Sequence, residues 1–158
     1  MSPNVDEHVH VLVSDSNAVC GGPVDELDRE STTDRLAPIF KGAGDPIPGM
    51  RRTVSTDDLV FTAGQIPLTP DGDLLDDADI DVQTRQSLEN VEAVLAAADA
   101  GMDDVLKVTV SPEDIDDFDA MNDTYETFFD ADPPARSAVG VDGLPKGVGV
   151  EIEAVPTA

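Results

Sequence analysis

The sequence has few features other than a hydrophobic core that could hold a fold together. It contains one cysteine, Cys20, so no disulfide can form within the chain, and a reducing cytoplasm is the simplest setting. It has no tryptophan and one tyrosine, yet 40% of its 158 residues are hydrophobic, enough for one domain with its own core. No apolar run is long enough to span a bilayer, and no signal peptide is recognisable at the N-terminus. We therefore expect a cytoplasmic protein with no membrane partner.

Basic residues are scarce. Nine lysines and arginines stand against 34 aspartates and glutamates, which gives a formal net charge of −25. Proteins that bind nucleic acid neutralise phosphates with lysine and arginine, so this composition argues against a nucleic-acid partner. An aspartate-rich, lysine-poor composition is typical of halophilic proteins, because concentrated salt screens the repulsion between like charges. An acidic surface that binds a basic partner is the alternative.

The chain divides into an N-terminal extension and one domain. Residues 1–50 are mostly turn-rich and polar, and they predict an extension of uncertain order. Residues 51–158 carry regular patterns: a β-rich run over 58–66 predicts a strand, and residues 79–101 predict a helix. The apolar stripe of that helix consists of Leu88, Val91, Leu95 and Ala98.

Residues 104–110 alternate as in a strand, with Leu106, Val108 and Val110 predicted on one face. A second helix is predicted to follow, with Ser111 as N-cap and Pro112 at its first position. The apolar stripe of this second helix consists of Phe118, Met121, Tyr125 and Phe128. Two final strands, 135–142 and 148–155, are separated by "GLPKG". The sum predicts an α+β fold, a mixed β-sheet backed by two α-helices.

Arg136 and Glu151 are the strongest pair for chemistry. If the last two strands pair around "GLPKG", these two residues lie directly opposite each other. A guanidinium is a rigid fork for a carboxylate, either that of Glu151 or that of a substrate. A glutamate beside it can orient or deprotonate a water molecule. An ordinary cross-strand ion pair is the alternative.

The sheet face away from the helices is predicted to be polar. Such a face suits a subunit interface that lines a cleft. The residues assigned to it are Arg136, Ala138, Gly140, Gly149, Glu151 and Glu153.

Other motifs are weaker. His8 and His10 form an H-x-H pair, but nothing nearby completes a metal shell, so we expect no metal site. The aspartate-rich run 71–81 lacks the spacing of a calcium loop. No P-loop or dinucleotide motif is present, and we expect no cofactor.

Six motifs occur in an order that resembles the RidA/YjgF family of reactive imine deaminases. They are "LVFTAGQIPLTPDG", "QTRQSLENVEAVL", "DVLKVTV", "DFDAMNDTYETFF", "PARSAV" and "LPKGVGVEIEAV". The resemblance covers about residues 51–155 and is greatest to members from salt-loving archaea. It implies a chorismate-mutase-like α+β domain that forms a homotrimer, with active sites in clefts between subunits. It also implies hydrolysis of 2-imino acids, such as 2-iminobutanoate and 2-iminopropanoate, to 2-oxo acids and ammonia without a cofactor.

By position, the resemblance implies that Arg136 binds the substrate carboxylate and that Glu151 orients the attacking water. Glu153 shares a strand face with Glu151 and ranks second for the water. Gly64 would contribute a backbone contact and Asn122 a polar contact. Ala138 stands where relatives often carry a cysteine, and it is included among the substrate-binding positions.

The N-terminal part departs from the family pattern. Relatives usually carry a Gly-Pro-Tyr-Ser-Gln-like segment before the strand that ends near Gly64, whereas here "RRTVST" runs straight into "DDLVFTAGQ". The departure supports an alternative function, a catalytically impaired relative that binds small carboxylates or takes part in protein interactions.

Overall fold

The structure is a computed structural model that describes residues 53–56, 58–129 and 132–158. The expectations for residues 1–50, including those for His8, His10 and Cys20, lie outside the described residues.

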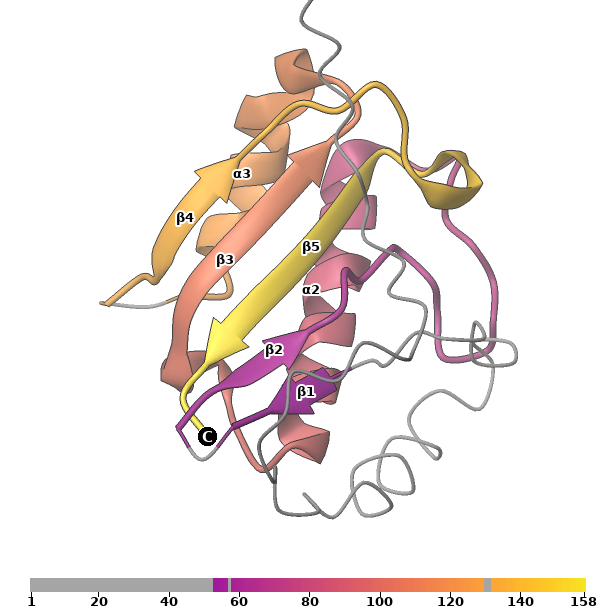
Figure 1. Ribbon diagram of the computed structural model, residues 1–158. Coiled ribbons are helices and arrows are strands. Elements are labelled where there is room, and N and C mark those ends of the chain that lie inside the picture. The colour runs from indigo at the N-terminus through magenta and orange to yellow at the C-terminus, as the bar shows by residue number, and fades with distance from the viewer. Residues whose placement is uncertain (1–52, 57, 130–131) are drawn as a thin grey trace, which may run out of the picture.

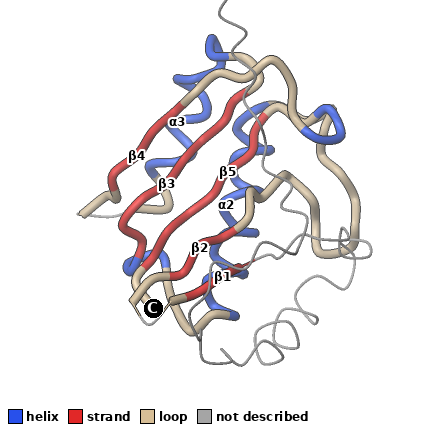
Figure 2. Tube along the Cα trace, viewed as in Figure 1, coloured by secondary structure: helices blue, strands red, loops and turns tan. Residues whose placement is uncertain are grey.

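The strands form one continuous layer. Strand β3 (Val105–Pro112) lies between β4 (Ala135–Ala138), which is parallel to it, and β5 (Val150–Pro156), which is antiparallel. An antiparallel pair, β1 (Thr53–Ser55) and β2 (Val60–Thr62), extends the layer beyond β5 (Figure 2). Two isolated bridges, Leu59 with Thr157 and Gln65 with Ile152, join this pair to β5. The sheet is therefore mixed, as predicted.

Helices α2 (Ile80–Ala97) and α3 (Phe118–Glu126) cover one face of the layer (Figure 1). Three short 3₁₀ helices complete the described elements: Met102–Asp104, Ile115–Asp117 and Pro145–Gly147. Apolar residues of both helices pack against β3 and β5, and the cluster consists of Leu88, Val91, Leu95, Ala100, Val105, Val108, Val110, Met121, Tyr125, Val150, Ile152 and Ala154. This confirms the predicted α+β fold with two helices behind a mixed sheet, and both predicted apolar stripes contribute to the core.

The predicted face of β3 is wrong at one residue. Leu106 is 53% exposed, whereas Val105 joins Val108 and Val110 in the core. The register with β5 shifts between Val105 and Lys107. Such a bulge inserts an extra residue and breaks the two-residue alternation on which the prediction depended.

The predicted start of the second helix is also wrong. Ser111 and Pro112 continue β3, and the N–H of Glu113 donates to the carbonyl of Gly149 at 2.9 Å. The helix begins only at Phe118. The capping pattern is a local signal, and pairing with β5 satisfies the same backbone groups in the sheet instead.

The predicted pairing of the last two strands is wrong because β3 lies between them. The chain runs from β3 through α3 to β4, and a helical crossover of this kind produces a parallel neighbour. Strand β5 therefore occupies the other edge of β3. Arg136 lies opposite Val108, and Glu151 lies opposite Ser111.

Candidate active site

Arg136 and Glu151 lie on opposite faces of the sheet. Residues directly opposite each other on paired strands share a face, so Arg136 points toward the helices with the buried Val108. Glu151 lies between the core residues Val150 and Ile152 on β5, so its side chain points to the other face. The sequence interpretation that assigned Arg136 and Ala138 to the open face is wrong, whereas Glu151 and Glu153 do lie there.

The guanidinium of Arg136 is held between β4 and α3. Its Nη2 donates to Oδ1 of Asn122 at 2.7 Å. Its central carbon lies 4.3 Å from the ring centroid of Tyr125 and 5.5 Å from that of Phe118. Both separations are within the range of a cation–π contact, which fixes the plane of the guanidinium without consuming its hydrogen-bond donors.

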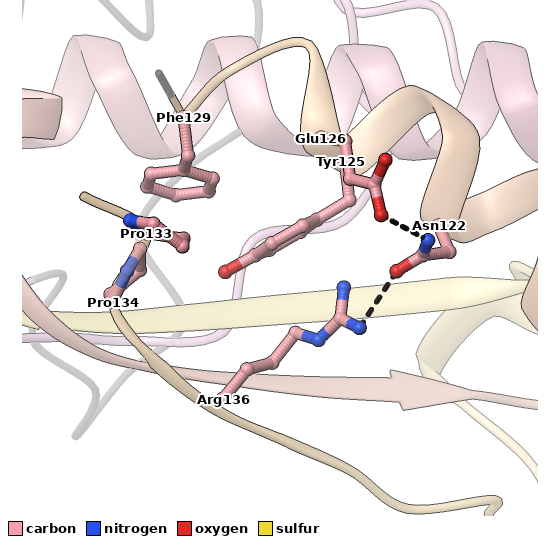
Figure 3. Close-up of a pocket in the computed structure, with 7 residues that line it drawn as sticks. All are labelled: Asn122, Tyr125, Glu126, Phe129, Pro133, Pro134 and Arg136. Carbon is pink, nitrogen blue, oxygen red and sulfur yellow. Dashed lines mark hydrogen bonds between the residues drawn. The ribbon is translucent and has the colours of Figure 1, made fainter. Parts of the chain in front are cut away.

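Arg136 lines a half-open pocket of about 500 Å³ between α3 and β4 (Figure 3). The other lining residues are Asn122, Tyr125, Glu126, Phe129, Pro133 and Pro134. Within the described residues Arg136 forms no ion pair, so N–H groups of its guanidinium remain available to donate to a ligand. A pocket with aromatic and proline surfaces, a few polar side chains and one such cation suits a small organic acid.

Tyr125 lies against this pocket and is 4% exposed. Its hydroxyl group is buried and has no hydrogen-bond partner among the described atoms. Burial raises the pKa of Tyr125 to about 12, although the positive charge of Arg136 acts in the opposite direction. The hydroxyl therefore stays protonated at neutral pH and is a potential donor.

Gly64 and Glu151 form a second cluster on the open face. A Cβ atom added to Gly64 would overlap the carboxyl group of Glu151 and lie 2.7 Å from its Cγ. The antiparallel bridge between Gln65 and Ile152 places Gly64 opposite Glu153 and diagonal to Glu151, whose side chain reaches across to Gly64. Partial burial, followed by the negative charge of Glu153, raises the pKa of the Glu151 carboxyl.

The predicted site residues thus separate into two groups within the chain. Arg136 and Asn122 meet in the pocket, and Gly64 and Glu151 meet on the open face. Ala138 lies opposite Val110 on the helix-facing side of β4 and does not line the pocket.

Sequence reasoning treated Tyr125 as core packing and did not single out Glu126, Phe129, Pro133 or Pro134. The spacing of four residues between Asn122 and Glu126 places both on one helix face, and this polar pair was the available signal.

The described residues lack membrane-spanning helices and metal-binding clusters. None of their helices has both the length and the apolar character needed to cross a membrane. No group of three or more histidine, cysteine or acidic side chains is placed to hold a metal ion among these residues.

Comparison with known proteins gives consistent matches. The family described as Endoribonuclease L-PSP matches residues 45–158. A RutC family protein of Pyrococcus horikoshii is 44% identical over 115 residues, which cover 73% of this chain and 91% of that protein. A 2-iminobutanoate/2-iminopropanoate deaminase of Salmonella typhimurium is 47% identical over 100 residues, which cover 61% of this chain and 77% of that enzyme.

Solved structures share the fold. Escherichia coli TdcF with bound serine is 41% identical with a TM-score of 0.69, and the match covers 75% of this chain and 94% of TdcF. The YjgF gene product of E. coli is 40% identical with a TM-score of 0.69, and the match covers 76% of this chain and 96% of that one. The chain therefore belongs to the Endoribonuclease L-PSP family, the family of the RidA and YjgF proteins.

Proposed function

We propose that the protein hydrolyses reactive 2-imino acids, such as 2-iminobutanoate and 2-iminopropanoate, to 2-oxo acids and ammonia. The observation that carries the proposal is the Arg136 guanidinium, which lines the pocket between α3 and β4 and forms no ion pair among the described residues. Related proteins at about 45% identity are named for this reaction. The structure of TdcF holds serine, a small molecule with a carboxylate of the same kind.

The reaction requires little of the protein. A protonated imine carbon is already electrophilic, so holding substrate and water in place supplies much of the catalysis. Arg136 binds the substrate carboxylate through its fork. Glu151 accepts a proton from water as the water oxygen bonds to the imine carbon, which gives a carbinolamine. Glu151 then passes its proton to the nitrogen of the carbinolamine. The carbon–nitrogen bond breaks while the hydroxyl proton returns to the Glu151 carboxylate and from there to solvent, and the 2-oxo acid and ammonia are released.

The raised pKa of Glu151 suits this role, because a carboxylate whose charged form is disfavoured is a stronger base than an exposed one. The close contact with Gly64 confines its side chain to one side. Glu153 is exposed and has no comparable enclosure, so we assign the water to Glu151.

One subunit cannot present both groups to one substrate, since Arg136 and Glu151 lie on opposite faces of its sheet. We therefore place the active site between subunits of a homotrimer. In this arrangement Arg136 and Asn122 of one subunit face Gly64 and Glu151 of the next. A dissociated subunit is then expected to be inactive.

The test uses threonine dehydratase to generate 2-iminobutanoate and follows its loss with and without the protein, in dilute and in concentrated salt. We expect the wild-type protein to accelerate the loss and Arg136→Ala to abolish the acceleration. Arg85→Ala is the matched control, because Arg85 is an exposed arginine of α2 that does not line the pocket. If the wild-type protein has no effect, or if Arg136→Ala equals it, the proposal fails.

The absent Gly-Pro-Tyr-Ser-Gln-like segment favours a second candidate, a relative that binds small carboxylates without turning them over. Isothermal titration with 2-oxobutanoate separates the two. Binding that requires Arg136, in a protein without deaminase activity, supports the second candidate.

A further inference from the structure

A chain of two hydrogen bonds leads from the end of α3 to the proposed carboxylate-binding group. Glu126 is the last residue of α3, and its Oε1 accepts a hydrogen bond from Nδ2 of Asn122 at 2.7 Å. Oδ1 of Asn122 accepts from Nη2 of Arg136, also at 2.7 Å. Figure 3 shows the three side chains in this order along one wall of the pocket.

Glu126 and Arg136 contact opposite ends of the Asn122 amide and together set its orientation. A carboxamide can present either its oxygen or its NH₂ group, whereas a carboxylate can only accept and a guanidinium can only donate. The carboxylate of Glu126 therefore favours the orientation in which Asn122 turns its NH₂ group toward Glu126, which is the orientation that Arg136 also requires. The amide oxygen is left to accept from Arg136. Without Glu126, Arg136 is the one partner among the described contacts that still holds the amide.

The intervening amide also keeps the cation available. A carboxylate in direct contact with Arg136 would occupy the fork that the substrate needs. Here Glu126 contacts Asn122 and not Arg136, and Asn122 occupies a single N–H donor of the guanidinium. The ring of Tyr125 supports the face of the guanidinium without taking a donor. The remaining N–H groups can point into the pocket.

We propose that Glu126 is a positioning residue, which orients the amide of Asn122 so that Asn122 holds the Arg136 fork ready for a substrate carboxylate. The inference rests on the proposed function, because it assigns Glu126 a part in binding the same substrate. It makes no claim that Glu126 contacts the substrate.

Glu126→Ala is expected to raise the KM for the 2-imino acid by roughly tenfold, the effect of losing one charge-assisted hydrogen bond, with kcat almost unchanged. Glu126→Gln keeps an oxygen that can accept from Asn122, so its KM is expected to stay near the wild-type value. Asp123→Ala is the matched control, because Asp123 is an exposed acid of the same helix that does not line the pocket. Circular dichroism and thermal melting check that each variant is folded.

A double-mutant cycle separates positioning from a general effect of charge. In a protein that already carries Asn122→Ala, removal of Glu126 is expected to have no further effect on KM. A wild-type KM in Glu126→Ala overturns the proposal. So does a KM in Glu126→Gln as high as that in Glu126→Ala, which would show that the charge acts and not the orientation.

Failure of the positioning role of Glu126 can be distinguished from failure of the proposed deaminase function. If the wild-type protein lacks deaminase activity, titration with 2-oxobutanoate takes the place of the kinetic assay. The same pattern in Kd, weaker binding for Glu126→Ala and wild-type binding for Glu126→Gln, supports the positioning role without turnover. Equal Kd values for wild type and Glu126→Ala overturn it.

Discussion

The carboxyl group of Glu151 lies so close to Gly64 that a Cβ atom at position 64 would overlap it. The two residues are far apart in sequence and meet because Gln65 and Ile152 exchange backbone hydrogen bonds of 2.7 and 3.0 Å. The glycine is thus explained by close approach, since its φ angle is not in the left-handed region. The missing side chain at Gly64 leaves room for the ionisable side chain of Glu151 on the open face of the sheet.

Gly64→Ala is expected to lower deaminase activity far more than stability. The new methyl group would displace the Glu151 side chain, which is flexible and can move, so the melting temperature should change little. A catalytic group shifted by about 1 Å can lose roughly a hundredfold in rate, and we expect a loss of this order in kcat. Gly143→Ala is the control, because a Cβ atom at Gly143 meets nothing within 4 Å. Full activity in Gly64→Ala would contradict the assignment of Glu151.

Glu151→Gln is expected to stabilise the protein while lowering kcat by roughly 10²- to 10⁴-fold, the usual effect of losing a general base. The pKa of Glu151 is raised in the folded state, so the folded protein binds its proton more readily than the unfolded chain does. The ionised carboxylate therefore destabilises the fold, and stability falls as pH rises through the window between the usual and the raised pKa. Melting curves at neutral pH test this, and a lower melting temperature for Glu151→Gln would contradict it.

The sequence allowed the helices and the central strand to be predicted because their apolar residues repeat locally. The errors arose where a contact between distant segments decides the outcome. Leu106 leaves the core face because of a bulge against β5, and Ser111 remains in the sheet because β5 pairs with it. Neither partner is visible in the local sequence.

Two pairs of the predicted site residues lie together, but the arrangement of the pairs differs from the prediction. Asn122 and Arg136 do meet, as do Gly64 and Glu151. The direct pairing of Arg136 with Glu151 is wrong, because strand order depends on the crossover through α3 and cannot be read from the spacing of two strands. The part played by Glu126 was not visible, because it depends on which way one amide points.

Glu153→Gln is expected to move the acidic limb of the kcat/KM–pH profile toward lower pH. The negative charge of Glu153 disfavours ionisation of Glu151 and is the second cause of its raised pKa, after burial. Removing that charge lowers the pKa of Glu151, so the active carboxylate form persists to more acidic conditions. The shift should be larger in dilute than in concentrated salt, because salt screens the interaction.

The control for this profile is Glu89→Gln, which removes an exposed charge from α2 and should leave the acidic limb in place. A movement of the limb toward higher pH in Glu153→Gln would rule out Glu151 as the titrating group.

Tyr125→Phe is expected to raise the free energy of unfolding by about 1 kcal/mol. The hydroxyl is buried without a partner, and an unsatisfied buried polar group costs about 1–3 kcal/mol that phenylalanine does not incur. The ring remains beneath the guanidinium of Arg136, so the KM for the 2-imino acid should stay near that of the wild type. Urea unfolding at fixed salt measures the first effect and steady-state kinetics the second. Tyr125→Leu, which removes the ring, should raise KM, because the guanidinium then loses its nearest aromatic face. Weaker stability in Tyr125→Phe would show that the hydroxyl is bonded in solution, and a higher KM would show that it binds the substrate.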